Sequence, residues 1–96
     1  MSDPALLILA SLAGGEKHGY AMCEDIQRFA GVRLGPGTLY GAITRLEERG
    51  WIRAVKSADD RRQPYALTAD GRRQLQAQAS ELDQVVKTAL RRLRHA

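Results

Sequence analysis

Residues 35–52, GPGTLYGAITRLEERGWI, decide how this chain folds. A Pro/Gly turn opens a helix here, and Gly50 closes it immediately before a short apolar segment. A charged turn follows at residues 57–63, SADDRRQ, and leads into a second apolar segment at residues 64–67. A helix followed directly by a hairpin with a basic tip predicts a winged helix-turn-helix. In that architecture the helix enters the major groove of DNA and the hairpin, called the wing, lies along the backbone.

The helix predicted for residues 36–49 has one apolar and one polar face. Leu39, Ile43 and Leu46 recur at helical spacing, with Ala42 beside them, so this side packs on the rest of the domain. The opposite side carries small or hydrogen-bonding residues, which a helix that reads a groove needs. The residues of this helix predicted to contact DNA are Gly37, Thr38, Tyr40, Thr44 and Arg45.

The wing supplies the predicted phosphate ligands, which are Lys56, Arg61, Arg62 and Gln63. Acidic residues leave an alternative open, because Asp59 and Asp60 would blunt the wing if they paired with its arginines. Three residues of the helix also have alternatives. Thr38 could cap the helix, and Tyr40 could cover the wing. Arg45 could pair with Glu48 or Glu47 in a surface ion pair of little energetic value.

Two further helices precede this unit. Asp3 and Pro4 suit the N-cap and first position of a mostly buried helix, which the glycines at residues 14–15 end. The second helix runs from Gly19 or Tyr20 to about residue 29. Its apolar residues at helical spacing are Met22, Cys23, Ile26 and Phe29.

The last helix is predicted for residues 69–94, with Thr68 as its N-cap. Its heptad-like apolar seam consists of Leu75, Ala79, Leu82, Val86, Ala89 and Leu93. A helix of this length spans about 39 Å, and the small head before it cannot cover the whole seam. A second copy of the helix is the economical partner, which predicts a homodimer. The alternative is a helix folded back on its own head.

Composition limits the remaining function classes. The chain has 96 residues, 44% hydrophobic residues and a net charge of +4, which describes one small folded domain and permits DNA binding. No apolar run is long enough to cross a bilayer, so we expect a cytoplasmic protein without a membrane partner. The single cysteine and the spacing of the two histidines predict no metal site or cofactor. No arrangement typical of catalysis is present, so we expect no enzyme.

The central motif also resembles a known family. Residues 36–40, PGTLY, with the RLEE run at 45–48, Gly50 and the Leu-Thr pair at 67–68, are similar to the signature of the PadR family of bacterial transcriptional regulators. The HGY run at residues 18–20 matches another part of that pattern. The resemblance implies a homodimeric repressor on a palindromic operator, in some members released by a small aromatic or drug-like effector. The last helix has no aromatic residue, so stacking on such an effector would use a residue elsewhere, such as Trp51 or Phe29.

The sequence therefore predicts a mostly α-helical winged helix-turn-helix with a small β-hairpin wing. Residues 1–68 are expected to form the DNA-binding domain, and residues 69–96 a C-terminal dimerisation helix, together one compact unit. The predicted function is a dimeric, sequence-specific transcriptional regulator that acts as a repressor. The alternative, from a different class, is a winged-helix module that binds a partner protein and does not bind DNA.

Overall fold

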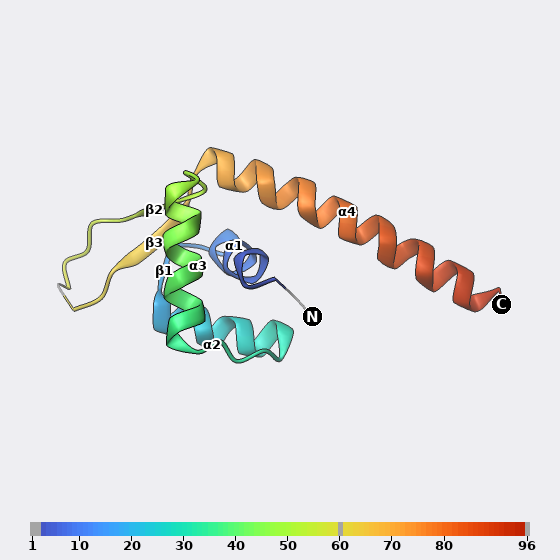
Figure 1. Cartoon of the computed structure of the whole chain (residues 1–96), viewed down its shortest axis with the longest axis horizontal. Coiled ribbons are helices and arrows are strands. Elements are labelled where there is room, and N and C mark those ends of the chain that lie inside the picture. Colours follow the sequence, from blue (N-terminus) through green and yellow to red (C-terminus); the bar gives the residue numbers. More distant parts are fainter. Residues whose placement is uncertain (1–2, 60, 96) are drawn as a thin grey trace.

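The computed structural model describes residues 3–59 and 61–95, and it confirms the predicted fold class. The helices are α1 (Pro4–Ala13), α2 (Gly19–Ala30), α3 (Pro36–Glu48) and α4 (Ala69–Arg94). The strands are β1 (Lys17–His18), β2 (Ile52–Ala54) and β3 (Pro64–Leu67). Helices α1 to α3 and the three-stranded antiparallel sheet, in the order β1-β3-β2, form the head. The wing and α4 leave the head in opposite directions (Figure 1).

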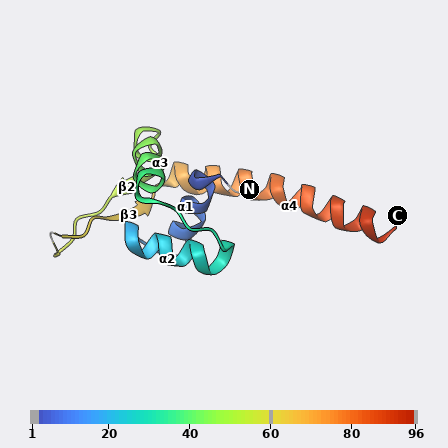
Figure 2. The ribbon, with the colours of Figure 1, turned by 60° about the horizontal axis from the view of Figure 1, so that its bottom comes forward.

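The core lies between α1, α2 and α3, and β2 closes one end of it. Its buried apolar side chains are Leu7, Ile8, Leu9, Leu12, Met22, Ile26, Leu39, Ala42, Ile43, Leu46 and Ile52. The predicted cap of α1 is present, since the Asp3 carboxylate accepts a hydrogen bond from the Ala5 N–H at 3.1 Å. The buried Ser11 hydroxyl donates to Asp25 at 2.8 Å and so links α1 to α2. The turned view in Figure 2 shows the same packing of three helices beside the sheet.

Two details of the head differ from what the sequence predicted. Strand β1 was not predicted, because its two residues form a strand only by pairing with Pro64 and Tyr65 of β3. Phe29, predicted on the apolar face of α2, is 51% exposed, so that prediction is wrong. The buried stripe of α2 continues from Ile26 to Ala30, four residues on, and this leaves Phe29 rotated toward solvent.

Helix α4 packs against the head only by its first turns. Leu75 lies against the core, whereas the larger apolar side chains beyond it are exposed, from 49% for Leu82 to 73% for Leu93. The alternative of a helix folded back on its head is therefore wrong (Figures 1 and 2). Among the helices described, none combines the length and apolar character that crossing a bilayer requires.

Candidate nucleic-acid interface

Helix α3 is fixed in the head at both of its ends. Pro36 occupies its first turn, where a missing N–H costs nothing. At the other end Gly50 adopts a left-handed conformation, with φ 76°. Its N–H donates to the Glu47 carbonyl, and the Trp51 N–H donates to the Leu46 carbonyl, each at 3.0 Å. These paired bonds form a Schellman motif, which ends the helix and turns the chain into β2.

The outward face of α3 agrees with the predicted pattern. The apolar stripe of α3 is buried. The predicted contact residues are all exposed, namely Gly37, Thr38, Tyr40, Thr44 and Arg45. Gly35 is the N-cap and no side chain caps α3, so Thr38 keeps its hydroxyl for other partners. The Thr44 hydroxyl donates to the Tyr40 carbonyl at 2.9 Å, which leaves its oxygen as an acceptor. No acidic side chain in the described residues pairs with Arg45.

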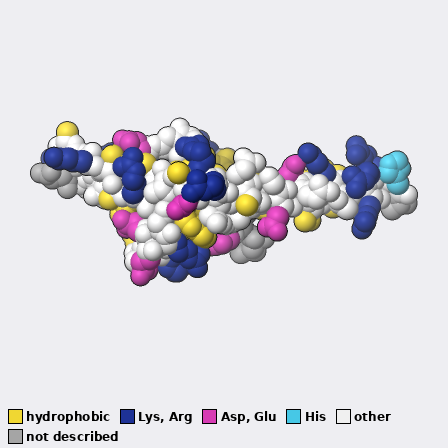
Figure 3. Space-filling model, turned by 90° about the horizontal axis from the view of Figure 1, so that it is seen from above, with side chains coloured by type: hydrophobic (Ala, Val, Ile, Leu, Met, Phe, Trp, Pro, Cys, Tyr) yellow, Lys and Arg dark blue, Asp and Glu magenta, His cyan; other side chains and the backbone are white. Residues whose placement is uncertain are grey.

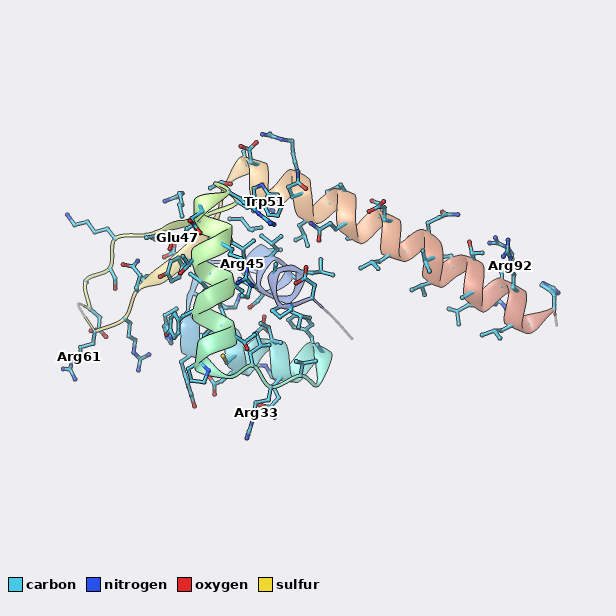
Figure 4. The ribbon with its side chains drawn as sticks, in the orientation of Figure 1. Arg33, Arg45, Glu47, Trp51, Arg61 and Arg92 are labelled. Atoms are coloured by element: carbon cyan, nitrogen blue, oxygen red, sulfur yellow. The ribbon has the colours of Figure 1, made fainter. Side chains whose placement is uncertain are left out.

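The wing extends well away from the helices. Lys56 and Arg61 are exposed, and Figure 4 shows Arg61 at the far end of the loop with its side chain directed away from the head. In the space-filling view, separate Lys and Arg side chains lie on the wing and on the head, and others gather near the far end of α4 (Figure 3). Among the described residues no side-chain hydrogen bond or ion pair involves the Arg61 guanidinium, so this group is available to a phosphate.

Arg62 and Gln63 have partners inside the molecule. Arg62 lies 3.0 Å from Nε2 of His18 and 3.9 Å from the Asp59 carboxylate, so the predicted alternative of pairing with the wing's acidic residues is realised for this arginine. Asp60 lies outside the described residues. The Gln63 amide nitrogen donates to the carbonyls of Val55 at 2.9 Å and Pro64 at 2.7 Å. In this conformation the side-chain amide of Gln63 connects the two sides of the wing at its base, and both of its N–H groups are already engaged.

Tyr40 joins α3 to the start of α2. Its hydroxyl lies so close to Gly19 that a Cβ at that position would be 2.8 Å from the phenol oxygen. Nearby, burial raises the pKa of Tyr65, with further contributions from the charges of Glu47 and Tyr40. Tyr40 is nevertheless 52% exposed. The absent side chain of Gly19 thus allows Tyr40 to lie across α2 and still face solvent.

A hollow of about 190 Å³ lies where α2, α3 and the wing meet, and it is lined by His18, Gly19, Tyr20, Tyr40, Arg61, Arg62 and Gln63. Four of the nine predicted DNA-contact residues are therefore brought together here, namely Tyr40 of α3 and Arg61, Arg62 and Gln63 of the wing. The other five predicted residues do not line it, namely Gly37, Thr38, Thr44, Arg45 and Lys56. Sequence reasoning missed His18 and Gly19 as parts of this site, although the HGY run at residues 18–20 carried the signal.

A second hollow, of about 460 Å³, separates α2 from the start of α3, with Cys23, Leu34, Leu39 and Tyr40 among its lining residues. Cys23 is half-buried, its thiol lies 3.9 Å from the Leu34 carbonyl, and burial raises its pKa. A raised pKa keeps the thiol protonated and weakly reactive, which favours the predicted packing role. Within residues 3–59 and 61–95 no three His, Cys, Asp or Glu side chains are placed to hold a metal ion.

The helix bundle, the wing and the long C-terminal helix together define a winged-helix protein as the class of this chain. The sequence profile of the transcriptional regulator PadR-like family matches residues 8–77. The chain therefore belongs to the PadR-like family of transcriptional regulators, as the resemblance had indicated.

Particular relatives include an uncharacterized protein and a transcriptional regulator. The chain is 41% identical over 81 residues to an uncharacterized 37.1 kDa protein of a Streptomyces fradiae transposon, covering 84% of this chain but only 23% of that protein. It is 32% identical over 87 residues to a transcriptional regulator of Mycobacterium tuberculosis, covering 88% of this chain and 80% of that one. The crystal structure of a PadR family transcription regulator from Clostridium difficile has the same fold, with a TM-score of 0.82 at 24% identity over 94% of this chain and 97% of that one.

Proposed function

We propose that this chain binds a palindromic operator in double-stranded DNA as a homodimer and represses transcription by occupying it. The observation that supports this best is that Tyr40 of α3 and Arg61 and Arg62 of the wing line one exposed hollow. A duplex placed there would meet the outward face of α3 in its major groove and the arginines at its backbone. Phosphate contacts position the protein, and the side chains of α3 read the bases.

We assign DNA binding to the part of the chain up to residue 68 and pairing to the helix from residue 69. The exposed apolar residues Leu82, Val86 and Leu93 follow each other at the spacing of a helix-pairing seam. A second copy of α4 would cover this seam and place two reading helices on the two halves of a palindrome. Binding of two half-sites at once raises affinity through effective concentration.

Binding isotherms test this function. Duplexes are first selected from a random library with the full chain, and the selected duplex is then compared with a scrambled one at about 50 and 200 mM salt. We expect preference for the selected duplex at both salt concentrations and a steep loss of affinity for both duplexes at the higher one. A protein that binds neither duplex at low salt would instead be the interaction module that does not use DNA.

A further inference from the structure

The junction between α3 and α4 is built around one residue, Thr68. Its hydroxyl donates to the Gly50 carbonyl at 2.6 Å and its N–H donates to the Trp51 carbonyl at 3.1 Å. Both acceptors belong to the turn that ends α3. The same hydroxyl accepts a hydrogen bond from the Gly71 N–H at 3.0 Å and so caps α4. The polar groups of Thr68 therefore bind the end of one helix and the start of the other.

Gly71 brings the two segments closer than any other residue would allow. A Cβ at this position would lie 1.8 Å from the Trp51 carbonyl oxygen and 2.8 Å from its carbon. Both atoms are backbone, so no side chain can rotate out of the way. Gly71 is buried, unlike the outer residues of α4. A helical backbone does not itself require glycine at this position. Its position is explained by the close approach of α4 to the turn after α3.

Further contacts hold the same junction on either side. The Arg49 guanidinium lies over the Trp51 ring, 5.1 Å from its centre. One turn beyond Gly71, Leu75 packs on the core, and α4 also contacts α1. Figure 4 shows Trp51 where the end of α3 meets the first turn of α4. The direction in which α4 leaves the head is thus set within a few residues.

We propose that Thr68 and Gly71 are positioning residues that fix the angle between the reading helix and α4, and thereby the spacing of DNA half-sites that the protein accepts. The effect on half-site spacing rests on the proposed function, because it requires two heads to be held together by paired α4 helices. The rigid junction itself does not depend on DNA or on pairing. A rotation of α4 at this junction would swing each α3 relative to its partner and displace it from its half-site.

Distances between spin labels test the junction directly. Labels are attached to Thr38→Cys and Arg91→Cys in a Cys23→Ala background, with labelled chains diluted by unlabelled ones so that only distances within a chain are measured. The parent and Thr68→Ser, which keeps the hydroxyl, are expected to give one narrow distribution. Thr68→Val, which keeps the shape but loses the hydroxyl, and Gly71→Ala are expected to give displaced or broader ones. A broad parent, or parental distances in both variants, overturns the inference.

The DNA consequence is tested with duplexes whose two half-sites are separated by different numbers of base pairs. The parent and Thr68→Ser should favour one spacing, and in Thr68→Val this preference should fall by roughly tenfold while binding to an isolated half-site stays the same. An unchanged preference despite altered label distances overturns the link to spacing. If the parent binds no duplex, the proposed function and the spacing claim fail together, and the label distances alone decide whether the junction is rigid.

Discussion

The head and the outer part of α4 differ in the burial of their apolar residues. In the head, side chains such as Ile8, Met22 and Leu46 are completely buried. In α4 beyond Leu75, the larger apolar side chains are all about half exposed or more. The head therefore completes its own core, whereas α4 presents an apolar stripe that no other part of the described chain covers.

The free energy of covering the exposed stripe indicates how stable a dimer formed through α4 would be. Full burial of a Leu or Val side chain stabilises by roughly 1.5–3 kcal/mol, so covering a half-exposed one contributes about 1 kcal/mol. Five such residues on each of two helices would contribute on the order of 10 kcal/mol, against an association cost of about 4–15 kcal/mol. A dimer held by this stripe is consequently near the limit of stability, and one charged substitution within it should be decisive.

The largest effect is expected for Leu82→Asp. It places a carboxylate in the middle of the proposed pairing surface, where burial without a partner costs several kcal/mol. Sedimentation velocity should show a dimer for the parent and a monomer for the variant, with operator affinity lost in parallel. Gln84→Asp introduces the same charge two residues away, on the opposite side of the helix, and should remain dimeric. A parent that sediments as a monomer at tens of micromolar would remove the basis for the pairing surface.

The next largest effect is expected for the double substitution Arg61→Ala and Arg62→Ala in the wing. Each phosphate contact contributes about −0.9 to the slope of log affinity against log salt concentration. The variant should bind all duplexes more weakly and with a flatter slope, measured by titration at several salt concentrations. Removing Arg91 and Arg92 from the far end of α4 deletes the same charge and should leave the slope unchanged. Equal slopes for the two double variants would show that the wing does not contact the backbone.

Most of the secondary structure could be predicted because local signals were strong. The caps at Asp3 and Thr68 and the left-handed Gly50 are visible as residue types, and the bounds of α1 and α4 matched. Strand β1 and the packing of Tyr40 against Gly19 could not be predicted, since both arise from contacts between residues distant in sequence. For the same reason the partner of Arg62 was ambiguous: the sequence suggested the nearby carboxylates, whereas the structure adds His18, which lies 44 residues earlier.

A smaller effect, limited to specific DNA, is expected for Arg45→Ala on α3. An arginine that donates two hydrogen bonds to guanine contributes roughly 1–3 kcal/mol of discrimination. Competition between the selected and a scrambled duplex should therefore show a reduced affinity ratio, with circular dichroism unchanged. Arg28→Ala on α2 removes an equal charge from a residue paired with Asp25 and should keep the parental ratio. An unchanged ratio in Arg45→Ala would mean that the discriminating contacts lie on other side chains.

The groups with raised pKa values also differ between the head and α4, because those in the head are partly buried and the one on α4 is exposed. In the head, burial raises the pKa of Tyr65, because a phenolate is poorly solvated there. On α4, the pKa of Lys87 is raised by a hydrogen bond to Asp83 at 2.7 Å, at an exposed site. Exposed ion pairs of this kind contribute little to stability. Burial also raises the pKa of the Cys23 thiol, so Tyr65 and Cys23 should both make the stability of the head depend on alkaline pH.

The smallest effect is expected for Tyr65→Phe, measured as the free energy of unfolding in urea from pH 7 to pH 11. The pKa of Tyr65 is higher in the folded than in the unfolded chain, where it lies near 10. As the pH rises through that value, unfolded chains ionise first, so the parent loses stability until the folded pKa is passed. Tyr65→Phe should show a shallower alkaline loss, because the titrating phenol is gone. Tyr20→Phe removes a phenol that is 68% exposed and should follow the parent. Identical alkaline losses in Tyr65→Phe and the parent would show that the two states do not differ at this residue, and the contrast would then rest on the apolar side chains alone.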